Sequence, residues 1–117
     1  MVYTGTHDND TTVGWWTGGV GHSTRSHTDR ENEREHARRY LDLDEREVHW
    51  QFIRAVLASV ADTAIVPVQD LLGLGSEARM NRPGTDTGNW RWRLVPGQLT
   101  RGTARKLAVM TETYDRV

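Results

Sequence analysis

The sequence contains no cysteine among its 117 residues. This absence excludes a disulfide scaffold, a thiolate nucleophile and a zinc site built on cysteine, and it fits a reducing compartment. Long apolar runs are also missing, because no stretch approaches the length of a membrane span. The N-terminus has no basic-then-apolar signal pattern either. From these absences we expect a soluble, cytoplasmic chain without a membrane partner.

The sequence also lacks an excess of either charge. Lys and Arg number 15 and Asp and Glu number 16, which gives a net charge of -1. Nucleic-acid-binding proteins usually carry a basic excess, because they neutralise phosphates, so we expect no nucleic-acid partner. Apolar residues make up 36% of the chain, and the mean hydropathy is -0.70. This composition is enough for one small domain.

A polar stretch close to the N-terminus is the most informative feature of the sequence. Val2 and Tyr3 favour a strand, and that strand ends abruptly in His7, Asp8 and Asn9. Parallel α/β folds place their chemistry at the carboxyl ends of strands. A carboxylate, an imidazole N–H and an amide together suit sugar hydroxyls, because each hydroxyl both donates and accepts. The stretch therefore predicts a carbohydrate site, where a carboxylate could stabilise an oxocarbenium-like transition state.

Four helices are predicted from capping residues and from apolar spacing. The expected caps are Asp10 or Thr11, then Thr28 in a capping box with Glu31, Asp44 with Glu47, and Thr100. The second helix, which ends near Leu41, is dense in Arg and Glu and should lie on the outside. The core-facing stripe of the third helix is His49, Phe52, Ile53, Val56, Leu57 and Val60. The inner face expected for the last helix is Ala104, Leu107, Ala108, Thr111 and Tyr114.

A second strand is predicted over residues 64–68, where a continuous apolar run favours a strand buried on both faces. Gln69 and Asp70 follow it, so polar groups again come after a buried strand. Two such strands joined by helices form a right-handed βαβ unit. The irregular segment 71–94 comes next, and loops of this length in compact domains tend to be functional. It contains Asn81, whose amide could serve the same site.

Other chemistries fit the sequence less well. The DND triplet that begins at Asp8 lacks the later Gly and Glu of a calcium loop, and no nucleophile elbow supports a Ser-His-Asp triad. His22 and His27 have no acidic or cysteine companion in register, so we expect them to be solvated and not to bind metal. The tryptophans are expected mainly in packing. Two alternatives stay open: platforms for a sugar ring, and a clamp for single-stranded nucleic acid at 90–93.

Two long segments resemble the 4-α-glucanotransferases, also called amylomaltases or disproportionating enzymes. The first runs from Tyr3 to Trp16 (YTGTHDNDTTVGWW) and is similar to the stretch after barrel strand seven of that family. The second runs from Pro67 to Asn81 (PVQDLLGLGSEARMN), continues with GNWRWR at 88–93, and is similar to the family's strand-eight loop. Both segments are rich in Gly and Trp and occur in the family's order. The resemblance therefore covers essentially the whole chain.

The resemblance implies an α/β fold that is the C-terminal part of a (β/α)8 barrel, about strands seven and eight, with residues 1–117 as an incomplete domain. It implies a retaining enzyme that transfers α-1,4-glucan segments between maltooligosaccharides through a covalent glycosyl-enzyme, without a metal or an organic cofactor. Asp8 matches the third catalytic carboxylate of the family, and His7 and Asn81 match residues that bind sugar hydroxyls. Asn9, Gln69 and Asp70 are expected to support substrate binding there.

The resemblance also identifies parts that this sequence lacks. The family's nucleophilic Asp and acid/base Glu lie on earlier strands, and no part of this chain corresponds to them. A retaining mechanism needs that pair of carboxylates about 5 Å apart, and a barrel needs about 250 residues. We therefore expect a portion of a longer protein, inactive alone and partnered by the N-terminal part of its own barrel, in a bacterial cytoplasm or a plastid. The alternative is a stand-alone carbohydrate-binding fragment that uses Trp15, Trp16, Trp90 and Trp92 as platforms.

Overall fold

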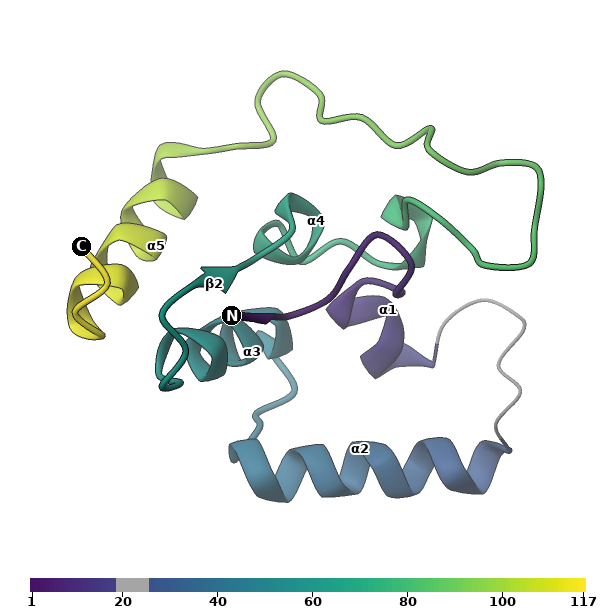
Figure 1. Ribbon diagram of the computed structural model, residues 1–117, viewed down its shortest axis with the longest axis horizontal. Coiled ribbons are helices and arrows are strands. Elements are labelled where there is room, and N and C mark those ends of the chain that lie inside the picture. Colours follow the sequence, from purple (N-terminus) through teal and green to yellow (C-terminus); the bar gives the residue numbers. More distant parts are fainter. Residues whose placement is uncertain (19–25) are drawn as a thin grey trace.

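The computed structural model describes residues 1–18 and 26–117 (Figure 1). The elements in these ranges are β1 (Val2–Tyr3), α1 (Thr12–Thr17), α2 (His27–Leu41), α3 (Val48–Leu57), β2 (Ala64–Ile65), α4 (Val68–Leu71), the 3-10 turn η1 (Ser76–Ala78) and α5 (Arg101–Thr113). In Figure 1, α2 runs along one side of the molecule, and the long segment that leads to α5 runs around the opposite side. No helix in the described ranges is long and apolar enough to cross a membrane.

The two strands pair in parallel, which confirms the predicted α/β class and the parallel pairing. Val2 lies opposite Ala64 and Tyr3 lies opposite Ile65. The second strand is shorter than predicted, because pairing stops at Ile65 and Pro67 becomes the N-cap of α4. Proline has no N–H with which to continue the ladder. Ile65 is 46% exposed, so the prediction of a strand buried on both faces is wrong for these residues.

The shortened strand changes the setting of the two polar residues that follow it. Gln69 and Asp70 lie on the four-residue helix α4 and do not extend from the end of a strand. Asp70 is 2% exposed. Its carboxylate therefore accepts hydrogen bonds from groups of the protein itself.

Two of the predicted helix caps are confirmed. The Thr11 hydroxyl accepts a 3.0 Å hydrogen bond from the Gly14 N–H at the start of α1. The Thr100 hydroxyl accepts a 3.1 Å hydrogen bond from the Thr103 N–H at the start of α5. In each case the cap is a Thr with extended backbone, so the residue type and its place before the helix were sufficient to predict the cap.

The other two predicted caps are wrong. Helix α2 begins two residues earlier than the capping box, because the Ser26 side chain accepts the Asp29 N–H and Thr28 is already helical. Helix α3 has Glu47 at its N-cap without a side-chain cap. Asp44 instead accepts a 2.7 Å hydrogen bond from the Arg46 N–H and closes a turn before the helix.

The core is organised around α3. Trp50, Ile53 and Leu57 are buried, and Ile53 is completely enclosed. The partly buried side chains packed against them are Ala64, Val66, Leu71, Leu107, Met110 and Tyr114. The predicted stripe is therefore confirmed at Ile53, Val56 and Leu57. Val60 is fully exposed, because the helix ends at Leu57, and the buried Trp50 was not predicted.

Helix α5 meets this core through Leu107, Met110 and Tyr114. Ala104 and Ala108 are exposed, so the predicted inner face is wrong at those two positions. Arg116, just beyond the helix, closes the end of α3. Its guanidinium donates to the carbonyl oxygens of Leu57 at 2.6 Å, Ser59 at 2.8 Å and Ala61 at 2.8 Å.

Candidate functional site

The turn after β1 is built by Thr6 and Asn9. Both the backbone N–H and the hydroxyl of Thr6 donate to the Asn9 side-chain oxygen, at 2.7 and 3.0 Å. The Asn9 N–H donates back to the Thr6 carbonyl at 3.1 Å, and the Asp8 N–H lies 3.3 Å from the Thr6 hydroxyl oxygen. A side-chain amide that closes a turn in this way fixes the backbone between its ends. The turn therefore presents His7 and Asp8, and Asn9 supports it.

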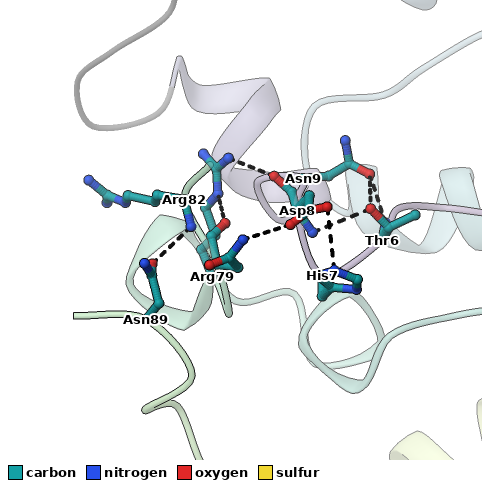
Figure 2. Close-up of polar contacts among 8 residues, drawn as sticks. Thr6, His7, Asp8, Asn9, Arg79, Arg82 and Asn89 are labelled. Atoms are coloured by element: carbon teal, nitrogen blue, oxygen red, sulfur yellow. Dashed lines mark hydrogen bonds and ion pairs between the residues drawn. The ribbon is translucent and has the colours of Figure 1, made fainter. Parts of the chain in front are cut away.

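A second loop, just after η1, meets this turn (Figure 2). The Asn81 side-chain amide donates a 2.7 Å hydrogen bond to Asp8 Oδ1. The Asn81 N–H donates to the His7 carbonyl at 3.1 Å. These contacts bring together three of the residues singled out in the sequence, although Asn81 lies 73 positions from Asp8.

Arg79 joins the same two loops through their backbones (Figure 2). One terminal nitrogen donates to the Asp8 carbonyl at 2.7 Å, and Nε donates to the Asn81 carbonyl at 2.8 Å. Arg79 was not predicted as a site residue. Its only sequence signal is its position two residues before Asn81.

The His7 ring lies close to a carboxylate and to an indole. Its Nε2 is 3.4 Å from Asp8 Oδ2, and the side chains of His7 and Asp8 are 55% and 49% exposed. The Trp90 ring also lies close to the His7 ring, with 5.1 Å between ring centroids. Trp90 itself is 58% exposed. Half-exposed donors and acceptors beside an exposed aromatic face are the groups that a sugar needs.

The backbone at Trp90 is unusual and is held by hydrogen bonds. Its φ is +59°, in the left-handed region that non-glycine residues rarely adopt, and its N–H donates to the Met80 carbonyl at 2.6 Å. The neighbouring Asn89 side chain accepts from the Arg82 N–H at 2.9 Å and donates to Thr85. Strained backbone held in this way is common at binding sites.

Asp70 and Gln69 line the same small cleft as His7 and Asn9, whose volume is about 180 Å³. The Asp70 carboxylate accepts the Thr4 hydroxyl at 2.5 Å and the Thr12 N–H at 2.8 Å. It therefore ties β1 to the start of α1. The Gln69 side chain donates to the Ala78 carbonyl at 3.3 Å.

The remaining sequence candidates lie elsewhere. Trp15 packs edge-on against Phe52, with 5.9 Å between ring centroids, and the Arg38 guanidinium lies 5.3 Å from the Trp16 ring. These contacts are those of packing residues. His27 is the exposed first residue of α2, and His22 lies outside the described residues. No group of three or more potential metal ligands occurs in ranges 1–18 and 26–117.

A match to a protein-family model shows to which family the chain belongs. The model for glycoside hydrolase family 77, described as 4-alpha-glucanotransferase, matches residues 1–99. The chain belongs to this family. The resemblance seen in the sequence is thereby confirmed.

Individual members of family 77 match the chain along its whole length. The 4-alpha-glucanotransferase of Thermus thermophilus is 44% identical over 123 residues, which cover 100% of this chain and 23% of that protein. The 4-alpha-glucanotransferase of a Synechocystis species is 48% identical over 117 residues, covering 99% of this chain and 21% of that protein. The chain therefore spans about a fifth of the length of the curated relatives it matches.

A solved structure of this kind has the same fold. The amylomaltase from Streptococcus agalactiae in complex with acarbose superimposes with a TM-score of 0.81 at 30% identity. The match covers 99% of this chain and 22% of that chain.

Proposed function

We propose that residues 1–117 are the C-terminal portion of the catalytic (β/α)8 barrel of a 4-α-glucanotransferase, with β1 and β2 as barrel strands seven and eight. The proposal is supported by family membership and by the parallel pairing of the two strands. Each strand is followed by a segment that carries polar side chains, on the side where barrel enzymes bind substrate. Two strands cannot close a barrel, which needs eight, so the rest of the barrel is the partner of this chain.

The arrangement around Asp8 carries the functional part of the proposal. One carboxylate oxygen accepts the Asn81 amide at 2.7 Å, and the other lies 3.4 Å from His7 Nε2. In the proposed enzyme Asp8 is the third catalytic carboxylate: it binds hydroxyls of the sugar being cleaved and favours its distorted, positively charged transition state. His7 and Asn81 hold neighbouring hydroxyls. The substrates are α-1,4-glucans and maltooligosaccharides.

The proposed reaction retains configuration through a covalent glycosyl-enzyme. It requires a nucleophilic carboxylate and an acid/base carboxylate about 5 Å apart, and we assign both to the rest of the barrel. Asp10 and Asp70 are the other carboxylates beside the cleft. Both are occupied by protein donors, namely Ser76 for Asp10 and Thr4 and Thr12 for Asp70. We therefore propose that the chain alone does not transfer glucans.

A second candidate function is binding of carbohydrate by the chain alone. It is favoured by Trp90, which is 58% exposed beside His7, while Trp92 is half-buried in the same segment. It is disfavoured for Trp15 and Trp16, whose rings contact Phe52 and Arg38. Titration of the chain with acarbose, followed by Trp fluorescence, tests it. No binding below millimolar concentration would rule it out.

A chimera tests the main proposal. This chain replaces the matching segment of the Thermus thermophilus enzyme, to which it is 44% identical, and maltotriose disproportionation is measured. We expect an active chimera, an inactive isolated chain, and a loss of at least about a hundredfold in kcat for Asp8→Asn, the scale on which transition-state electrostatics act. The matched control is Asp62→Asn, an exposed carboxylate before β2. A folded chimera without activity would overturn the proposal.

A further inference from the structure

Arg79 links the two segments that carry the proposed sugar ligands, and no role has been assigned to it so far. We propose that Arg79 is a positioning residue, which fixes the spacing of Asp8 and Asn81 during glucan transfer without itself binding the reacting sugar. The inference rests on the function proposed above. It concerns the Arg79 side chain, the backbone carbonyls of Asp8 and Asn81, and the glucan-transfer step.

The first support is the geometry of the guanidinium. It donates to the Asp8 carbonyl at 2.7 Å and to the Asn81 carbonyl at 2.8 Å. The first of these bonds joins residues 71 positions apart. A guanidinium is planar and its donors point in fixed directions, so two bonds from one group set both distance and angle. A lysine ammonium is a point charge on a flexible stem and cannot reproduce that fork.

The second support comes from the atoms that form the other hydrogen bonds between the two loops. The two loops are also joined by the bond from the Asn81 amide to Asp8 Oδ1 and by the bond from the Asn81 N–H to the His7 carbonyl. The first of these uses the two side chains that are proposed to bind sugar. When hydroxyls compete for that carboxylate and that amide, the bond between them is weakened or shared. The Arg79 bonds use backbone carbonyls, so they persist when substrate is bound.

The third support is the exposed position of Asp8, which in the described residues is bonded from outside its own turn by Arg79 and Asn81. Its side chain is 49% exposed, and it stands on a four-residue turn closed by Thr6 and Asn9. A carboxylate on an exposed turn can shift by an ångström at little cost. A displacement of that size can lower the rate about a hundredfold. Arg79 opposes this shift at the backbone, through its bond to the Asp8 carbonyl.

The test compares Arg79→Lys and Arg79→Gln in the active chimera. We expect both variants to lower kcat for maltotriose about tenfold to a hundredfold with KM nearly unchanged, because the positioning acts on the transition state. We expect 10–100 mM guanidinium, an order-of-magnitude range for a small-ion rescue, to restore part of kcat in Arg79→Gly. The melting temperature of each variant is measured alongside, at the assay pH.

Arg82 provides the matched control in the same loop. Its backbone N–H bonds to Asn89, and a substitution keeps that bond. Within the described part of the chain, no hydrogen bond or ion pair is formed by its guanidinium. Arg82→Lys and Arg82→Gln are expected to keep kcat within about twofold of the parent chimera, which is the scale of an ordinary surface substitution.

The possible outcomes separate the inference from the proposed function. A folded but inactive parent chimera overturns the proposed function, and this inference with it. An active parent with normal kcat in Arg79→Lys overturns the inference alone. A raised KM with unchanged kcat would make Arg79 a direct sugar ligand, and a lost kcat that returns on cooling would make its role one of stability. Either result also overturns the inference.

Discussion

The Asp10 carboxylate accepts a 2.7 Å hydrogen bond from the Ser76 hydroxyl, across 66 positions of sequence. Helix α1 passes beside this pair at Gly14. A Cβ at Gly14 would lie 2.5 Å from the Ser76 hydroxyl oxygen and closer still to the carboxylate of Asp10. The bond between Asp10 and Ser76, which ties the turn after β1 to η1, therefore requires glycine at this position of the helix.

Gly14→Ala is the first prediction from this contact. We expect the free energy of unfolding of the chain to fall by about 1–3 kcal/mol, because overpacking forces the partly buried pair of Asp10 and Ser76 apart. Urea denaturation measures the change. Gly102→Ala is the control, since its nearest neighbour would be a side-chain atom 3.7 Å away, and alanine there should stabilise α5 by about 0.5 kcal/mol. Equal effects of the two substitutions would contradict the steric argument.

Asp70→Ala is expected to destabilise the fold more strongly. Thr12 is 6% exposed, so its N–H is left buried without its acceptor, and the Thr4 hydroxyl loses its acceptor as well. Two such losses cost about 2–4 kcal/mol together. Urea denaturation of the chain measures this, with Asp62→Ala as the exposed control. A loss below about 1 kcal/mol, less than one buried unsatisfied donor, would show that water replaces the carboxylate.

His49 should make the stability depend on pH. Burial is the main cause that lowers the His49 pKa, and the positive charge of Lys106 lowers it further. The negative charges of Glu47 and Asp70 raise this pKa, but they do not outweigh burial. A folded-state pKa below the ordinary value of about 6.5 means that protonation favours the unfolded chain. The contribution of neutral His49 to the free energy of unfolding is therefore fully present above a pH of about 6.5. It is lost as the pH falls from there through the folded-state pKa.

His49→Gln tests this dependence. We expect the difference in free energy of unfolding between the original chain and the variant to change steadily between about pH 7 and 5, around the ordinary histidine pKa, in favour of the variant as the pH falls. Urea denaturation at several pH values measures it. Because the imidazole lies against Gly73, the variant also loses packing, but that loss does not depend on pH. A constant difference would exclude His49 as the titrating group.

Arg116 is predicted to stabilise the junction between α3 and α5. Arg116→Ala removes the donor from three carbonyls at the end of α3, and we expect a loss of about 1–3 kcal/mol. Arg116→Lys should recover only a part, because an ammonium cannot reach all three oxygens in one plane. Hydrogen exchange at the last turn of α3 would report the loosening locally. Arg105→Ala, on the exposed face of α5, is the control.

The sequence predicted those features of the fold that depend on residues close together along the chain, namely two helix caps and the buried stripe of α3. Thr11 and Thr100 cap their helices as expected, because an N-cap depends only on its own next three residues. The stripe around Ile53 is buried, because its spacing matches a helix face. The same spacing failed at Val60, because periodicity does not indicate where a helix ends.

The candidate site was only partly predictable. His7, Asp8 and Asn81 were selected from their residue types and positions, the family resemblance added their roles, and the structure brings them together. The bond from Arg79 to the Asp8 carbonyl could not be foreseen, because it depends on how two loops 71 positions apart meet. The left-handed backbone of Trp90 could not be foreseen either, because non-glycine residues rarely adopt it. The prediction that Asp70 supports the site stays a prediction, although its bonds to Thr4 and Thr12 are a form of support.

Helix α2 contributes no buried side chain in the structure. Most of its ion pairs, such as Arg39 with Glu35, join residues of the same helix, and Arg38 also pairs with Glu45 just beyond it. We therefore expect selection for folding to act only weakly on most of this helix. Mutations, and insertions of whole turns, should accumulate in α2 faster than in the loops around Asp8 and Asn81. For an engineer, α2 is the place to attach a tag or a second domain without disturbing the cleft.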